Sequence, residues 1–254
     1  MQYICTQQHF IKQNKNNMEV QDLEQIVRQR EGALSSAFPA LMRKVYLWMT
    51  LALVITGICA YGVATSPSLL QLIYMSRGAI WVLLIAELGL VFYTTARINH
   101  LSLTTATTLF AIYSALNGVT LSSIFLVYTM SSIASVFFIT AGTFAVTALF
   151  GYSTKRDLSK MGSLLFMALI GLILATVVNM FLHNGMLNLV LSYLGVVVFV
   201  GLTAWDSQKI KQMLAMQPDM GEGAQKVALM GALELYLDFI NLFLYLLRIF
   251  GKDR

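Results

Sequence analysis

The chain carries little charge. Only 11% of its 254 residues are Asp, Glu, Lys or Arg, whereas 57% are hydrophobic. Water-soluble domains usually carry about a quarter charged residues. The composition therefore excludes a soluble globular protein and indicates an integral membrane protein. Apolar segments of spanning length use up almost the whole chain, so we expect one domain.

Cysteine and histidine are also scarce, with two and three copies. Cys5 and Cys59 lie far apart, and the histidines show no metal-ligand spacing with them. We therefore predict no disulfide, no zinc site and no bound cofactor. The net charge of +5 comes from basic residues in short segments that flank apolar runs. They form no aromatic-interleaved patch, so nucleic acid is not an expected partner.

Seven stretches are long enough to cross about 30 Å of hydrocarbon as α-helices that rise about 1.5 Å per residue. They do not alternate apolar and polar residues as spanning β-strands do, so the fold class is an all-α bundle of seven transmembrane helices. Small residues four apart, such as Gly118 with Ser122 and Gly171 with Ala175, predict close helix packing. The predicted spans are residues 45–65, 79–96, 103–128, 132–152, 161–182, 186–205 and 227–247, with a turn at 128–131 between the third and the fourth.

The first 44 residues are polar and lack the apolar core of a secretory signal peptide. We therefore predict an N-terminal cytoplasmic segment at 1–44 and a single seven-helix transmembrane domain at 45–254, whose first span is an uncleaved anchor. With the N-terminus in the cytoplasm, the positive-inside rule is satisfied. Thirteen of the 17 basic residues then lie inside, and the other four are Arg77, Arg248, Lys252 and Arg254. The alternative has six spans and a re-entrant last segment, which returns the basic C-terminal tail to the inside.

The last span, in "ELYLDFINLFLYLLRIFG", is interrupted by polar residues. Glu234, Asp238, Asn241, Tyr245 and Arg248 recur at helical spacing and form one stripe on one face. A carboxylate at the centre of a bilayer costs at least about 2.5–3.5 kcal/mol, so the stripe is expected to face the bundle interior or a water-filled cavity. Arg248 is expected to reach the interface as an anchor.

Two further acids interrupt other spans. Asp206, in "GLTAWDSQKIK", lies beside Lys209 and Lys211, which leaves open an interfacial ion pair or a functional group. Glu87, in "AIWVLLIAELGLVFYTTA", has either a structural role or a place on an ion path. Asn117 is expected to form a hydrogen bond between helices.

The segments "AWDSQKIK", "LELYLDFINLFLYLLRIFG" and "ELGLVFYTTARINHLS" resemble the transmembrane Bax-inhibitor-motif family, and its bacterial members most of all. The likeness is strongest over residues 195–251. It implies a seven-helix fold whose last helix is central, a bacterial inner-membrane location and a pH-sensitive calcium leak across that membrane.

The resemblance also implies roles for single residues. Asp206 and Asp238 would be the pH sensor and gate, and they would also ligate Ca²⁺. Glu87 would line the ion path together with these two aspartates. Arg97 stands near the position of an arginine that latches the aspartate of the sixth helix. Glu234 and Asn241 would then belong to a polar stripe that supports the pair.

The chemistry of such a pair follows from electrostatics. Two carboxylates in one dry site cannot both ionise cheaply, so they hold one shared proton. When that proton leaves, repulsion separates the helices, and the oxygens become ligands for Ca²⁺. In the predicted spans, however, Asp206 lies at the membrane boundary and Asp238 about 16 Å into its helix. Pairing requires the sixth helix to continue past Lys211 or the seventh to begin near Gly231.

Other classes fit less well. Two aspartates on consecutive helices also occur in intramembrane aspartyl proteases, but the glycine-rich setting of the second aspartate is absent, and no Gly-x-Ser-x-Gly sequence occurs. We do not expect an enzyme. The alternatives are a proton-coupled cation transporter and a regulatory protein that restrains other membrane proteins. The expected partners are calcium ions, protons, the lipid bilayer and, in the regulatory alternative, membrane proteins.

Overall fold

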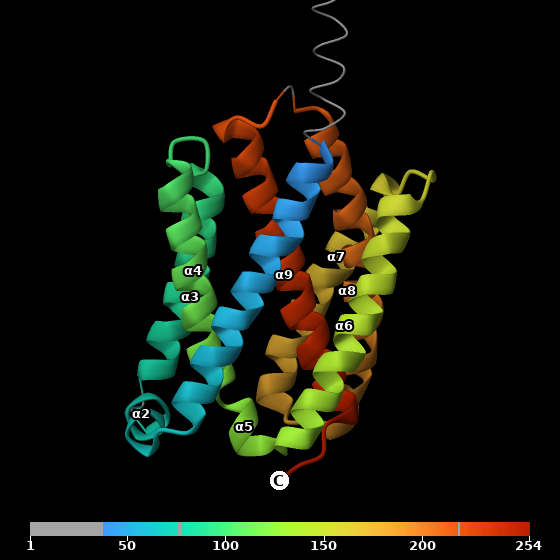
Figure 1. Cartoon of the computed structure of the whole chain (residues 1–254). Coiled ribbons are helices and arrows are strands. Elements are labelled where there is room, and N and C mark those ends of the chain that lie inside the picture. Colours follow the sequence, from blue (N-terminus) through green and yellow to red (C-terminus); the bar gives the residue numbers. More distant parts are fainter. Residues whose placement is uncertain (1–37, 76–77, 218) are drawn as a thin grey trace, which may run out of the picture.

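Long helices run side by side in the computed structural model, which describes residues 38–75, 78–217 and 219–254 (Figure 1). Seven of them are long and apolar enough to cross a membrane, which confirms the predicted fold class. They are the first span (Phe38–Ala64), α3 (Ala79–Arg97), α4 (Leu103–Leu121) with the short α5 (Ile124–Val127), α6 (Met130–Ser153), α7 (Ser159–Leu182), α8 (Gly185–Ala215) and α9 (Glu222–Phe250). A short α2 (Pro67–Leu70) and a π-helix, η1 (Gln71–Met75), follow the first span.

The helix boundaries lie within three residues of the predicted spans at most ends and differ by five residues or more at three places, one of which is the start of α9 at Glu222 instead of 227. The first span is already helical at Phe38 instead of 45, and residues 1–37 of the predicted N-terminal segment lie outside the described residues. The α8 helix continues to Ala215, where the prediction ended at 205, because its lysines find partners. Lys209 Nζ donates to Glu234 Oε1 and Lys211 Nζ donates to the Tyr152 carbonyl, each at 2.7 Å. Of the two extensions considered, the one past Lys211 is therefore correct.

The α9 helix is the most buried of the spans. Within its most apolar window 67% of the residues are buried, against at most 33% in the other spans. It packs against α4, α6 and α8. It is one continuous helix that reaches the end of the bundle near the C-terminus (Figure 1), so the re-entrant alternative does not describe this chain. Its burial favours the expected central position, which stays a prediction.

A buried hydroxyl joins α9 to two other helices. Tyr236 has no exposed surface, and its OH lies 2.7 Å from Thr56 Oγ1 and 3.2 Å from Asn117 Oδ1, to which it donates. Thr56 Oγ1 also lies 2.9 Å from the Ser114 carbonyl. Buried polar groups are costly without partners, so this network fixes the relative positions of the first span, α4 and α9.

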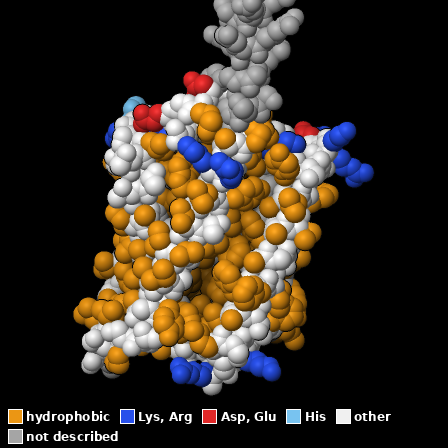
Figure 2. All heavy atoms as spheres, viewed as in Figure 1, with side chains coloured by type: hydrophobic (Ala, Val, Ile, Leu, Met, Phe, Trp, Pro, Cys, Tyr) orange, Lys and Arg blue, Asp and Glu red, His pale blue; other side chains and the backbone are white. Residues whose placement is uncertain are grey.

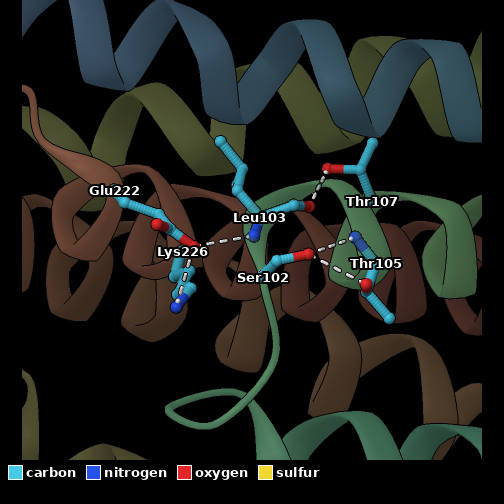
Figure 3. A network of polar contacts seen from close by, with 6 residues as sticks. All are labelled: Ser102, Leu103, Thr105, Thr107, Glu222 and Lys226. Atoms are coloured by element: carbon cyan, nitrogen blue, oxygen red, sulfur yellow. Dashed lines mark hydrogen bonds and ion pairs between the residues drawn. The ribbon is translucent and has the colours of Figure 1, made fainter.

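Hydrogen bonds also fasten both ends of α9. At its start, Glu222 accepts from the Leu103 N–H at 2.9 Å and pairs with Lys226 at 3.1 Å, while Ser102 caps α4 (Figure 3). The α4 and α9 helices therefore begin at the same end of the bundle. At the other end, the C-terminal tail pairs with the α5–α6 turn: the Thr129 N–H donates to the Lys252 carbonyl at 3.1 Å, and the Arg254 N–H donates to the Val127 carbonyl at 2.9 Å.

Small residues bring some helices into close contact. A Cβ on Gly118 would meet the Thr56 carbonyl and Cys59, so the expectation of close packing is confirmed there. It is wrong for Gly171, which is exposed and has no atom near its ideal Cβ position, because this side of α7 faces outward. The tightest contact, which the pattern did not single out, is between Gly151 of α6 and the Ala204 carbonyl of α8.

We predict that Gly151→Ala lowers the free energy of unfolding by about 1–3 kcal/mol, because the new methyl group overlaps the α8 backbone. The matched control is Gly142→Ala in the same helix, where nothing lies within 4 Å of the added atom. The control should be neutral or slightly stabilising, because alanine favours helix. Thermal unfolding in detergent measures both, and equal melting temperatures would contradict the close contact.

Candidate functional site

A cavity of about 400 Å³ lies between α7, α8 and α9. The residues that α7 contributes to its lining are apolar. The polar side chains of the lining come from α8 and α9. These side chains are Asp206, Lys209, Glu234, Asp238 and Asn241. The α9 stripe predicted to face the interior therefore lines a cavity.

The register of α8 against α9 brings these residues together. The two helices run antiparallel, with Ile210 packed on Gly231 and Tyr245 packed on Gly195. Between these two contacts, Asp206 comes level with the turn of α9 that carries Glu234 and Asp238. The latter two are four residues apart and share one face of the helix.

The two predicted sensor aspartates meet in this cavity. Asp206 of α8 and Asp238 of α9 both line it. Both residues are buried, with 8% and 5% of their surface exposed. Asp238 Oδ2 is buried and lacks a hydrogen-bond partner among the described residues, as does Glu234 Oε2. Buried oxygens without donors cost free energy, which a shared proton or a bound cation offsets.

A lysine supplies positive charge to the cluster. Lys209 Nζ lies 2.7 Å from Glu234 Oε1 and 3.6 Å from Asp206 Oδ1, and 5.2 Å from the centre of the Trp205 ring. The cavity therefore holds three carboxyl groups and one ammonium, so one lysine cannot neutralise the cluster if all three ionise. The sequence spacing indicated the Asp206–Lys209 pair. It could not indicate the Lys209–Glu234 pair, which depends on the register of the two helices.

This cluster supplies fewer oxygen ligands than a calcium ion needs. Across residues 38–75, 78–217 and 219–254, no group of three or more His, Cys, Asp or Glu side chains is arranged to hold a metal ion. Ca²⁺ takes six to eight oxygens, so an ion at Asp206 and Asp238 would also need water or amide oxygens. Asn241 fits this need, because its Nδ2 donates to the Leu237 carbonyl at 2.8 Å and its Oδ1 remains an acceptor in the cavity.

Glu87 belongs to a different polar cluster. Its Oε1 accepts from Thr120 Oγ1 at 2.5 Å, and its Oε2 accepts from Asn117 Nδ2 at 3.4 Å. Asn117 continues the network to Tyr236 of α9, which confirms it as a bond between helices. Tyr236 and Asp238 are two residues apart in a helix of 3.6 residues per turn, so they face nearly opposite sides. The structure therefore does not bring Glu87 to the aspartate pair. Sequence reasoning missed Thr120 and Tyr236, which have no charge to mark them.

The two arginines that the sequence singled out lie near helix ends. Arg97 is exposed at the C-terminal end of α3, a helix that packs on α4 and η1. In the described part of the chain, the basic residue that pairs with Asp206 is Lys209, so the latch role of Arg97 stays a prediction. Arg248 is exposed, as expected for an anchor, and lies 5.3 Å from the centre of the Tyr245 ring.

The helices and the buried acids define a multi-pass integral membrane protein. Comparison with known proteins identifies the family, because the model of the Inhibitor of apoptosis-promoting Bax1 family matches residues 39–254. The chain therefore belongs to the Bax inhibitor family.

Its relatives include bacterial proteins that match over most of their length. The chain is 51% identical to the inner membrane protein YbhL of Escherichia coli K12, over 84% of this chain and 92% of YbhL. It is 46% identical to an uncharacterized protein of Borreliella burgdorferi, over 84% of this chain and 92% of that protein. A protein of Deinococcus radiodurans is 37% identical over 92% of this chain and 99% of its own length.

We predict that Lys209→Met destabilises the folded protein by about 1 kcal/mol at neutral pH, because it leaves Glu234 and Asp206 without their cation in a half-buried site. The loss should shrink as the pH falls and Asp206 takes up a proton, because Lys209 then has one fewer negative partner to lose. Lys226→Met, which breaks the Glu222–Lys226 pair at a helix end, is the control and should cost only a few tenths of a kcal/mol. Thermal unfolding between about pH 5 and 8 measures both variants; a loss independent of pH would contradict the charge argument.

Proposed function

We propose that this protein is a pH-sensitive calcium leak channel of the bacterial inner membrane. One observation carries the proposal: the buried Asp206 and Asp238 line the same cavity, from α8 and α9. Membership of the Bax inhibitor family and the likeness to an inner membrane protein support the location. The cytoplasmic N-terminus is part of the proposal and rests on the distribution of Lys and Arg.

The gate in this proposal is a change in protonation. With one proton shared between them, Asp206 and Asp238 hold α8 and α9 together. When the proton leaves, two negative charges face each other in a site of low dielectric constant and repel. Calcium, the transported ion, then meets carboxylate oxygens from both helices and the free Asn241 Oδ1. Lys209 offsets part of the negative charge and so sets how easily the proton leaves.

Glu87 forms a second acidic position of the proposed path. It is 8% exposed and its carboxylate accepts from two side chains of α4, so it lies on the other side of α9 from the aspartates. An ion that passes both positions would stay beside α9 along its path. Arg97, at the end of the same α3 helix, is the proposed latch, which a movement of α3 toward α8 would engage.

Two alternatives predict different results. A proton-coupled transporter would exchange calcium for protons, so calcium flux would require a proton gradient. A regulatory protein that acts by binding other membrane proteins would move no ions when purified. We propose no catalytic activity, and ion flux in a purified system separates the three functions.

The test is calcium flux into liposomes that contain the purified protein and a calcium-sensitive dye. We expect flux that changes several-fold between about pH 6 and 8, because the proposed gate opens when a proton shared by two carboxyl groups is lost. Asp238→Asn should flatten this response, since an amide cannot exchange a proton with Asp206. The control is Asp253→Asn, an exposed aspartate outside the cavity, which should keep the response of the unmodified protein.

Three outcomes would count against the proposal. Absent flux at every pH favours the regulatory function. Flux that requires a proton gradient favours the transporter. A pH response that survives both Asp206→Asn and Asp238→Asn removes the shared-proton gate and leaves only a leak.

Glu87→Gln separates the two acidic positions. We expect it to lower calcium flux several-fold at all pH values while the ratio of flux at pH 6 to flux at pH 8 stays close to that of the unmodified protein. The reason is that Glu87 has its own partners and does not touch the aspartate pair. The conservative variant Thr120→Ser keeps the hydroxyl and serves as the control. A changed pH ratio in Glu87→Gln would contradict the separation.

A further inference from the structure

A second cavity, of about 520 Å³, lies between the first span and α6, with Phe239 of α9 among its lining residues. Its volume is within the range of about 300–1,000 Å³ that is typical of small-molecule sites. Hydrophobic side chains such as Met49, Leu53 and Phe137 form its walls, and Arg43 is the one charged residue of its lining. Figure 2 shows this hollow on the hydrophobic face, between the first span and α6 of Figure 1.

The cavity is a groove that runs along the helices. Its lining extends from Met42 to Leu53 in the first span, about 17 Å, and from Phe137 to Tyr152 in α6, about 22 Å. The side of α6 beside it is apolar and open, with Val146 70% exposed. In a multi-pass membrane protein this side faces lipid, and an apolar groove is filled more favourably by a hydrocarbon chain than by water.

Positive charge lies at one end of the groove. Arg43 is exposed there. Lys211 lies 4.8 Å from the centre of the Tyr152 ring and donates to the Tyr152 carbonyl, and Tyr152 is the lining residue at the same end. Lys and Arg side chains are visible above the hollow (Figure 2). Guanidinium and ammonium groups bind phosphate, so an amphiphile with an apolar chain and an anionic head matches the groove at both ends.

We propose that the groove holds one acyl chain of an anionic glycerophospholipid from the surrounding bilayer, with its phosphate at Arg43. This site is separate from the calcium path, but it borders the same helix, α9. Phe239, the residue after Asp238, has its ring 5.4 Å from that of Phe137 and 5.5 Å from that of Phe144. A lipid chain in the groove therefore packs against the helix that carries Asp238.

The test is native mass spectrometry of the full chain, purified in detergent and titrated with phosphatidylglycerol or phosphatidylcholine. We expect one phosphatidylglycerol to bind more tightly than phosphatidylcholine. Ala145→Trp fills the groove and should abolish this binding, whereas Val146→Trp, at the next position but outside the lining, should not. Arg43→Gln should weaken binding about fivefold through the lost charge. Lys160→Gln, an exposed lysine outside the lining, should leave it unchanged.

Several outcomes would overturn the proposal. They are equal binding of the two lipids, binding that survives Ala145→Trp, and equal loss in Arg43→Gln and Lys160→Gln. A dimer that Ala145→Trp dissociates would assign the groove to a second copy of the chain instead. If Ala145→Trp fails to fold, the comparison of Arg43→Gln with Lys160→Gln still decides the question, because both changes lie at exposed positions.

Discussion

The burial of carboxyl groups in a bilayer is the constraint on which this structure depends. A carboxylate there needs a proton, a cation or hydrogen-bond donors. The contact between α8 and α9 places Asp206 and Asp238 in one cavity, where Lys209 supplies a cation to Glu234 and Asp206. These partners allow α9 to be both the most buried span and the one that carries two of the acids.

Polar groups occupy two opposite sides of α9. On one side, Tyr236 joins Thr56 and, through Asn117, Glu87. On the other side lies the cavity with Asp206 and Asp238. The helix α9 therefore borders both acidic clusters and keeps them apart, since Tyr236 and Asp238 face nearly opposite sides of it.

The sequence was sufficient for the features that depend on local composition. Apolar runs of spanning length predicted the number of helices, and the spacing of polar residues in the last span predicted the side of α9 that lines the cavity. The sequence could not predict which residues of α8 face α9. That register follows from the fit of Ile210 on Gly231 and of Tyr245 on Gly195. The span boundary at 205 was wrong for a related reason, since hydropathy counts Lys209 and Lys211 as polar whether or not a tertiary partner satisfies them.

The C-terminal tail holds the last turn of α9 in place. Lys252 and Arg254 are hydrogen-bonded to the α5–α6 turn, directly after the helix ends. At the opposite end, the exposed Glu222 side chain makes the contact with α4. The tail thus provides a backbone pivot at one end, and a tilt about it displaces each residue in proportion to its distance from the pivot. Asp238 lies about 18 Å from Phe250 and Glu222 about 42 Å, so a tilt about this pivot would displace the start of α9 more than twice as far as Asp238.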